Sequence, residues 1–208
     1  MTTSLRVVSI TAQPRAPGYA LRFDARMGRA RRDAGGCLIQ HITARGNDRR
    51  DIFIDDADYR GFLAALGKVA EDHHWRTLAY CLMPNHIHLV VGADVDALSG
   101  GMRDLLGRHA RRFHRRHGTS GHLFGGRFHN VPVTDDRQVA AVVRYVARNP
   151  VTAGLCQDHG DWPWSSYGPS VGDSPPPAFL DVTWLWSLIA RDQAMARDYL
   201  RAVMRSAA

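Results

Sequence analysis

The stretch YCLMPNHIHLVVG, residues 80–92, decides the fold of this chain. It consists of two apolar runs that are separated by Pro84 and Asn85, two residues that favour tight connections. Short apolar runs bounded by turn residues are typical of buried strands. The stretch therefore predicts a β-hairpin, with one strand over residues 76–84 and a second over 86–93.

The sequence on either side of this hairpin alternates between strand-like and helix-like patterns. Apolar residues recur at helical spacing in DDADYRGFLAALGKVAEDHHW and again in two later segments. The elements that we expect are a strand over 37–47, a helix over 55–75, the hairpin, a helix over 95–118, a strand within 121–135 and a helix over 135–149 that stops at Pro150. This order is that of a ferredoxin-like sandwich. The expected fold class is therefore α+β: a ferredoxin-like antiparallel sheet with helices on one face, plus a helical C-terminal extension.

Composition divides the chain into three parts. Residues 1–34 are rich in arginine, alanine and glycine and lack a clear hydrophobic period, so we expect a flexible basic N-terminal arm. Residues 35–168 hold the strands and helices named above and are expected to form the main domain. Residues 169–208 are expected to form a C-terminal linker and helical extension.

The charge of the chain indicates an anionic partner. The formal net charge is +7, and Lys68 is the only lysine, so arginine supplies nearly all of the excess. Guanidinium groups match phosphate oxygens in geometry as well as in charge. We therefore expect nucleic acid as the partner. The alternative is a GC-rich genome that encodes its basic residues as arginine.

Several protein classes fit the sequence poorly. The three cysteines, Cys37, Cys81 and Cys156, are too scattered for a disulfide framework or a paired-cysteine metal site. No segment approaches the roughly 18 consecutive apolar residues of a membrane helix, and the N-terminus lacks the apolar core of a secretory signal. We expect a cytoplasmic protein without a membrane partner, associated with the nucleoid.

Two histidines inside an apolar strand raise the question of a metal site. His86 and His88 are two residues apart, so both imidazoles point to the same face of the sheet. This spacing also fits ordinary polar residues on a solvated face, so a third ligand is needed. Tyr145 and Asn149 are four residues apart and share one face of the third helix. If that face covers the histidines, two imidazoles and the Asn149 amide oxygen would suit Mg²⁺ or Mn²⁺, and zinc less well.

A tyrosine beside such an ion could attack a phosphodiester. The ion would stabilise the developing charge on the phosphate, and the Tyr145 phenol could attack phosphorus to form a covalent phosphotyrosine. The ordinary alternative is a half-buried aromatic residue on an amphipathic helix. No residue in the sequence identifies itself as the base that would accept the phenol proton.

Several motifs occur together in the order found in one protein family. They are PNHIHLVV within YCLMPNHIHLVV, then RRFHRRHGTSGHLFGGRF, RYVARNPVTAGL and WPWSSY. With its His-hydrophobic-His signature the chain resembles the HUH endonucleases. Among these it resembles the REP-associated tyrosine transposases, from about Gly35 to Tyr167 and more loosely through WLWSLIARD.

The resemblance implies the HUH endonuclease fold over residues 35–168 and a metal-dependent transposase activity. It implies that His86 and His88 bind a divalent metal, that Asn149 is the third ligand and that Tyr145 is the nucleophile. Such an enzyme cuts and rejoins single-stranded DNA near palindromic hairpins through a 5′-phosphotyrosine, without a nucleotide cofactor. We expect a monomer or a homodimer. One departure from the family pattern is FHNVPV, where relatives have a more basic run.

Arginine and aromatic residues give the expected contacts with DNA. An arginine-rich helix face and two loop arginines could follow a phosphate backbone, although a solvated helix face would look the same. The residues that we expect to bind DNA are Arg45, Arg108, Arg111, Arg112, Arg115, Arg116 and Arg127. The aromatic residues of WPWSSY could stack on bases, but we favour a packing role for them.

Two further functions compete with a transposase. A DNA hairpin-binding regulator on the same scaffold would not cleave, but the presence of both histidines, the tyrosine and the asparagine speaks against it. A metallohydrolase would use a bound water in place of the tyrosine. It would usually need a carboxylate close to the histidines, whereas Asp94 and Asp96 lie past the end of the strand.

Overall fold

The computed structural model describes residues 38–205. The arm that we predicted over 1–34 lies outside the described residues. The elements are β1 (Leu38–Arg45), η1 (Asn47–Arg49), α1 (Asp56–Asp72), β2 (Arg76–Met83), β3 (His86–Ala93), α2 (Val95–His117), β4 (His129–Pro132), α3 (Asp136–Thr152), η2 (His159–Asp161), α4 (Tyr167–Val171), α5 (Val182–Ile189) and α6 (Gln193–Arg205).

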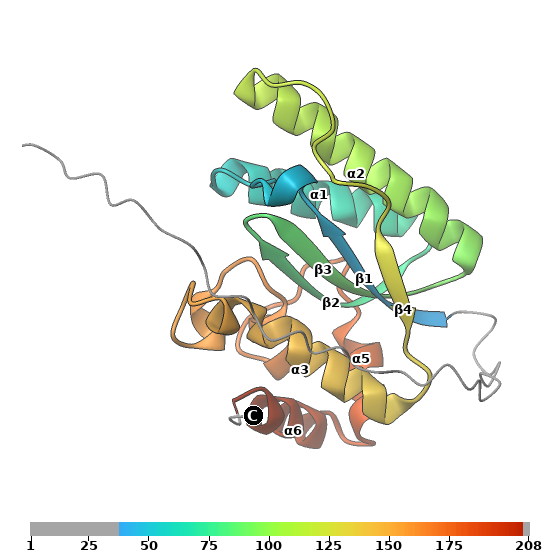
Figure 1. The fold of residues 1–208 in the computed structure, drawn as a ribbon. Helices are drawn as coiled ribbons and strands as arrows, with labels where there is room; N and C mark the ends of the chain where they lie inside the picture. The colour runs from blue at the N-terminus through green and yellow to red at the C-terminus, as the bar shows by residue number, and fades with distance from the viewer. Residues whose placement is uncertain (1–37, 206–208) are drawn as a thin grey trace, which may run out of the picture. The chain divides into compact units, whose positions relative to one another are not determined.

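The four strands form one antiparallel sheet in the order β2-β3-β1-β4 (Figure 1). The predicted hairpin is the pair β2–β3, and β1 lies between β3 and β4. This arrangement confirms the ferredoxin-like fold class. The register places His88 of β3 opposite Thr43 of β1 and Cys81 of β2, so β3 has a neighbouring strand on each side.

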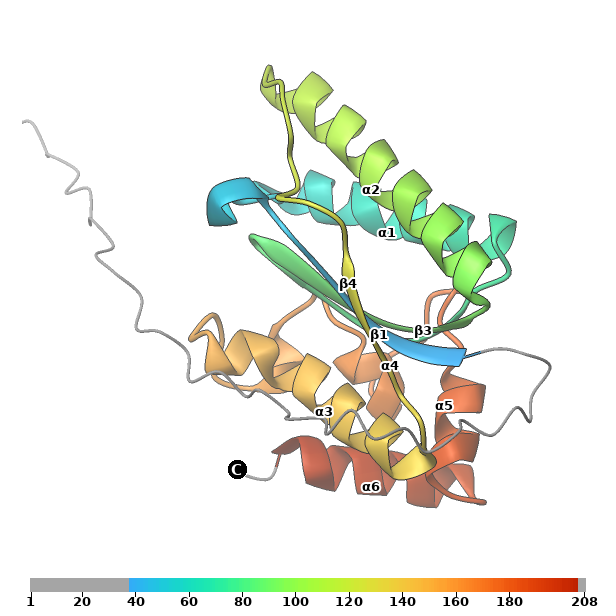
Figure 2. The ribbon, with the colours of Figure 1, turned by 45° about the vertical axis from the view of Figure 1, so that its right-hand side comes forward.

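Helices cover both faces of this sheet (Figures 1 and 2). One face packs against α1 and α2, as the ferredoxin-like order predicts, and its core includes Ile42, Ile87 and Leu89. The other face packs against α3 and the C-terminal helices, and its core includes Val90 and Val143. Because side chains alternate along a strand, each strand contributes to both cores. No helix within residues 38–205 is both long and apolar enough to span a membrane.

The third helix is longer than the sequence predicted. We expected it to stop at Pro150, but α3 contains Pro150 and ends at Thr152. A proline near the end of a helix removes a single backbone donor, and Pro150 is buried with the apolar side of α3. The turn is also held by Ala153, whose N–H donates to the Asn149 carbonyl over 2.9 Å. Packing therefore extends the helix past the proline.

The WPWSSY segment closes the free edge of β2. Trp162 donates its indole N–H to the Leu82 carbonyl over 3.0 Å, and Trp164 stacks on Tyr59 with ring centroids 4.6 Å apart. The Trp164 carbonyl in turn accepts the N–H of Leu82 over 2.9 Å, and Tyr167 is buried. An exposed strand edge invites pairing with other chains, so this segment packs and protects β2, as we favoured.

Candidate functional site

The face of the sheet that α3 covers carries the two histidines of the hairpin. β3 begins at His86, and His88 follows two residues later on the same face. Only 4% of His88 is exposed, and its Nε2 is buried without a hydrogen-bond partner within residues 38–205. A buried polar atom without a partner costs free energy in the folded protein, and a ligand bound to this nitrogen would offset that cost.

A third histidine, His41, joins this pair from β1. Its Nε2 lies 3.1 Å from Nδ1 of His88, and the two rings stack with centroids 5.3 Å apart. We did not predict this residue from the sequence. The signal was available, because the ferredoxin-like order places β1 next to β3. A histidine on the same face of β1 then becomes a neighbour of the hairpin pair.

Helix α3 brings Tyr145 and Asn149 to the histidines. The ring of Tyr145 stands almost perpendicular to those of His88 and His41, with centroids 5.5 Å and 5.7 Å away. Tyr145 is 48% exposed, so about half of this residue can be reached from solvent. Asn149 donates its amide Nδ2 to the Tyr145 carbonyl over 2.8 Å, and its side chain is close enough to His88 to influence the pKa of that ring. The structure thus assembles the residues that the sequence pointed to.

The imidazoles of this site are neutral at neutral pH. Burial, followed by the charge of His129, lowers the pKa of His41 to about 4. Burial, followed by the charge of Arg45, lowers the pKa of His86 to about 4. The pKa of His88 falls well below its ordinary value, mainly through burial; the Asn149 side chain opposes this shift and is the smallest of the contributions. Neutral imidazoles offer the lone pairs that a metal needs.

The donors at this site fit a hard divalent cation. Within residues 38–205 no group of three or more His, Cys, Asp or Glu side chains is arranged to hold a metal ion. The candidate ligands are Nε2 of His88, which has no hydrogen-bond partner within residues 38–205, the ring of His86 at a centroid distance of 5.0 Å from that of His88, and Oδ1 of Asn149. Two imidazoles and an amide oxygen leave positions open for water and phosphate oxygens.

The arginines that we expected to bind DNA have different surroundings. Arg45 ends β1 directly opposite His86 and is exposed. Arg111 and Arg115 are exposed on α2, and Arg127 is exposed in the segment that leads to β4. Arg108 forms an exposed ion pair with Asp72 at 3.6 Å. These five arginines retain at least part of their surface for a ligand.

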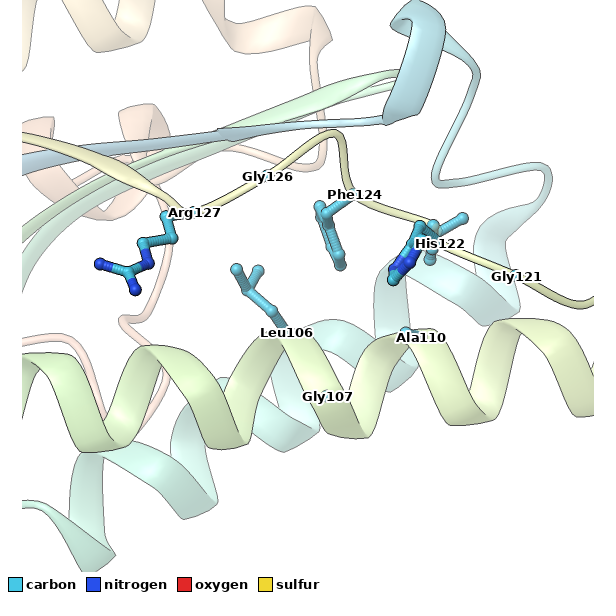
Figure 3. A pocket seen from close by; sticks show the side chains of 9 residues that line it. Leu106, Gly107, Ala110, Gly121, His122, Phe124, Gly126 and Arg127 are labelled. Atoms are coloured by element: carbon cyan, nitrogen blue, oxygen red, sulfur yellow. The ribbon is translucent and has the colours of Figure 1, made fainter.

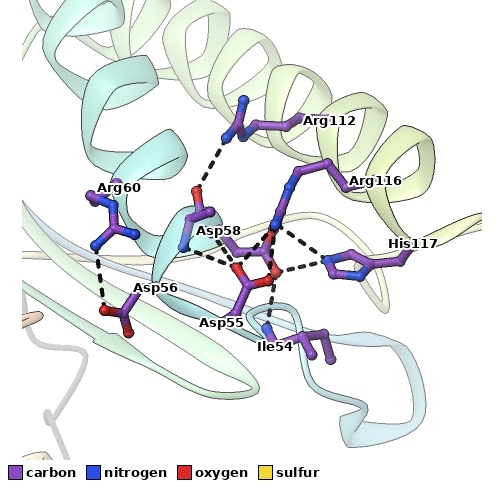
Figure 4. Close-up of polar contacts among 9 residues, drawn as sticks. Ile54, Asp55, Asp56, Asp58, Arg60, Arg112, Arg116 and His117 are labelled. Carbon is purple, nitrogen blue, oxygen red and sulfur yellow. Dashed lines mark hydrogen bonds and ion pairs between the residues drawn. The ribbon is translucent and has the colours of Figure 1, made fainter.

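Arg112 and Arg116 instead tie α2 to the start of α1 (Figure 4). Arg112 donates to the Ala57 carbonyl over 3.2 Å. Arg116 pairs with Asp55 at 2.9 Å and also with Asp58, whose side chain is 1% exposed. Asp58 accepts from the backbone N–H of Ile54 as well, over 3.0 Å. These contacts give both arginines a structural role in the folded chain.

A shallow cavity of about 460 Å³ lies between α2 and the glycine-rich segment that follows it (Figure 3). Leu106 and Phe124 contribute apolar surface, and Arg127 lies at one end. The neighbouring Leu123 belongs to the core on the α1 and α2 side of the sheet. The cavity is therefore separate from the histidine site, which lies on the α3 side.

Comparisons with known proteins agree with this geometry. Residues 37–149 match the family described as IS200-like transposases. A protein of Haemophilus influenzae that is described as a REP-associated tyrosine transposase is 26% identical over 153 residues, which cover 68% of this chain and 86% of that protein. A solved structure of a REP-associated tyrosine transposase bound to a REP hairpin shares the fold. Its TM-score is 0.56 and its identity 22%, over 80% of this chain and 93% of that one.

The family match covers the whole sheet, α1, α2 and most of α3, and it ends at Asn149. It therefore includes every residue of the histidine site. It confirms the resemblance that the motifs indicated, and the chain belongs to the family of IS200-like transposases.

Proposed function

We propose that this protein is a metal-dependent endonuclease and strand transferase that cuts and rejoins single-stranded DNA near palindromic hairpins through a 5′-phosphotyrosine on Tyr145. The observation that carries the proposal is the convergence of an exposed tyrosine and an asparagine of α3 on a buried histidine, His88, whose Nε2 has no partner within residues 38–205. Such an arrangement has no evident role in stability but has the parts that phosphoryl transfer needs.

His86, His88 and Asn149 would hold the cation, Mg²⁺ or Mn²⁺. The Asn149 amide is held beside His88, because its Nδ2 donates to the Tyr145 carbonyl and its side chain interacts with the His88 ring. When bound, the cation would supply positive charge against the developing charge of the phosphate.

Tyr145 would supply the nucleophile. Its phenol oxygen attacks phosphorus, the bond between phosphorus and the 3′ oxygen breaks, and the leaving oxygen takes up a proton to give a free 3′-OH. The proton of the phenol passes to solvent. The product is a 5′-phosphotyrosine ester, which conserves the phosphodiester bond energy, so attack by a 3′-OH reseals the strand without ATP. The 48% exposure of Tyr145 leaves room for a strand to approach.

The exposed arginines would bind the phosphate backbone. Arg45 is the nearest to the site, since it pairs with His86 across the sheet. Arg111, Arg115 and Arg127 add positive charge along α2 and the following segment. Phosphate contacts of this kind give affinity with a strong salt dependence and little sequence preference. A hairpin substrate agrees with the REP hairpin in the solved structure that shares this fold.

Covalent trapping tests this function. Purified protein is mixed with labelled single-stranded DNA that carries a hairpin from the flanks of its own gene, with Mn²⁺ or Mg²⁺, and is analysed on a denaturing gel. We expect a protein–DNA band that disappears with EDTA, with His86→Ala and with Tyr145→Phe. Cleavage that persists in Tyr145→Phe would indicate a metallohydrolase. Tight binding of several flanking hairpins without any cleavage would indicate the non-cleaving regulator.

A further inference from the structure

The two histidines of the proposed metal site share one feature: Nδ1 of each ring is already engaged. Nδ1 of His86 lies 2.6 Å from Oδ1 of Asn85, and Nδ1 of His88 lies 3.1 Å from Nε2 of His41. We propose that His41 is a positioning residue. It holds His88 in the tautomer whose Nε2 lone pair can bind a cation, as Asn85 does for His86. This inference rests on the proposed function of the site.

The contact of His86 defines its tautomer. Asn85 donates its Nδ2 to the Arg49 carbonyl over 3.2 Å, which fixes the orientation of the amide and leaves Oδ1 facing His86. A carboxamide oxygen only accepts hydrogen bonds. Nδ1 of His86 therefore carries the hydrogen, and its Nε2 carries the lone pair.

The contact of His88 allows two arrangements, because two neutral imidazoles share one hydrogen. If Nδ1 of His88 donates to Nε2 of His41, the Nε2 lone pair of His88 is available. If His41 donates instead, Nε2 of His88 carries a hydrogen and cannot bind a cation. Only the first arrangement matches that of His86 and supplies two imidazole lone pairs on one face of the sheet. His41 must then act as an acceptor.

The fold holds His41 in place for this role. His41 lies on β1 and pairs with Val90 of β3. This pair is two residues along the strands from the Thr43–His88 pair, so His41 and His88 lie on the same face of the sheet. Tyr145 stands against the rings of both His41 and His88 and restricts their rotation. Partners behind metal-binding histidines usually fix ring orientation, and their loss costs about 10–100-fold in metal affinity.

Two substitutions of His41 separate positioning from packing. Gln can place its side-chain oxygen near the position of the imidazole Nε2 and accept the hydrogen of His88. Leu has a comparable size but accepts nothing. His129→Leu is the matched control, because it removes a neighbouring histidine on β4 for which the structure shows no hydrogen bond with His86 or His88. Circular dichroism and thermal unfolding check that all variants are folded.

The measurements are Mn²⁺ affinity, from the electron paramagnetic resonance signal of free Mn²⁺, and the tautomer of His88, from long-range ¹H–¹⁵N NMR of the metal-free protein. We expect hydrogen on Nδ1 of His88 in the wild type, in His41→Gln and in His129→Leu, with Mn²⁺ affinities within about threefold of one another. In His41→Leu we expect this tautomer to lose its dominance and Mn²⁺ affinity to fall about 10–100-fold.

Two results would overturn the role of His41 alone. One is hydrogen on Nε2 of His88 in the wild type, and the other is a folded His41→Leu variant with unchanged Mn²⁺ affinity. A wild-type protein that binds no Mn²⁺ would instead reject the metal site itself, and the positioning role with it. The first two results leave Mn²⁺ binding by the wild type intact, so the failure of the inference is distinguishable from the failure of the proposed function.

Discussion

Two buried histidines, His109 and His88, lie on opposite faces of one sheet. His109 is 1% exposed on the side of α1 and α2, and His88 is 4% exposed on the side of α3. Burial is the largest cause of a lowered pKa in both. His109 donates Nε2 to the carbonyl of Ile52 over 2.7 Å, and core rings such as Phe53 and Phe62 surround it.

His88 has the same burial but a different environment. Its neighbours are His41, His86 and Tyr145, and each of these side chains carries a polar group. Each ring bonds through one nitrogen and has one buried nitrogen without a hydrogen-bond partner within residues 38–205, Nε2 in His88 and Nδ1 in His109. Burial alone therefore does not distinguish a structural histidine from a candidate ligand. The chemistry of the surrounding side chains does.

The largest effect is expected at Tyr145. Tyr145→Phe should abolish the covalent protein–DNA adduct, because the substitution removes the nucleophilic oxygen and leaves the ring packing unchanged. Tyr199→Phe is the matched control, since Tyr199 is 50% exposed on α6. Denaturing gels with labelled hairpin DNA measure both. An adduct that survives in Tyr145→Phe would mean that another residue attacks phosphorus.

The different surroundings of His88 and His109 predict that substitution of each residue affects metal binding differently. His88→Leu should abolish detectable Mn²⁺ binding, because it removes a proposed ligand; it also removes the hydrogen bond between Nδ1 of His88 and His41. His109→Leu should lower the free energy of unfolding by about 1–3 kcal/mol, because the buried Ile52 carbonyl loses its donor, and should leave Mn²⁺ binding intact. Denaturant unfolding and Mn²⁺ titration check the pair, and equal loss of Mn²⁺ binding in both variants would remove the distinction.

The lowered pKa values of the site predict an acid-sensitive metal-free protein. His41 and His86 titrate near 6.5 when unfolded and at about 4 when folded. Between these values the unfolded state binds more protons, so the stability present above pH 6.5 is lost as pH falls toward 4. Without metal, the free energy of unfolding should decrease over this window, and less steeply in His41→Gln. Denaturant unfolding at several pH values measures the slopes, and identical slopes would argue against a lowered pKa at His41.

The smallest effects on stability and DNA binding are expected for two neighbouring arginines of α2, Arg115 and Arg116. Arg116→Ala should lower the free energy of unfolding, because the buried Asp58 carboxylate loses a charged partner. Arg115→Ala should leave stability unchanged and reduce the salt slope of hairpin DNA binding by about one. Binding isotherms at several salt concentrations, with unfolding curves, measure both. If the salt slope of DNA binding changed in Arg116→Ala but not in Arg115→Ala, DNA would contact α2 at Arg116 and not at Arg115.

Periodicity and turn residues in the sequence were sufficient for most of the fold. The hairpin around Pro84 and Asn85, the first two helices and the ferredoxin-like order all follow from local patterns, because strand and helix periods depend on neighbouring residues. The end of α3 did not follow. Local rules stop the helix at Pro150, whereas packing of that buried residue carries it on to Thr152.

The sequence by itself determined which side chains the site contains: two histidines at strand spacing, and a tyrosine and an asparagine at helical spacing. Only the tertiary structure decided which groups surround them. It placed His41 of β1 beside His88, and it turned Arg116 of the basic helix face inward to Asp58. Both outcomes depend on contacts between residues 47 and 58 positions apart. Spacing along one element specifies which of its side chains share a face, but only strand order and helix packing bring two elements together.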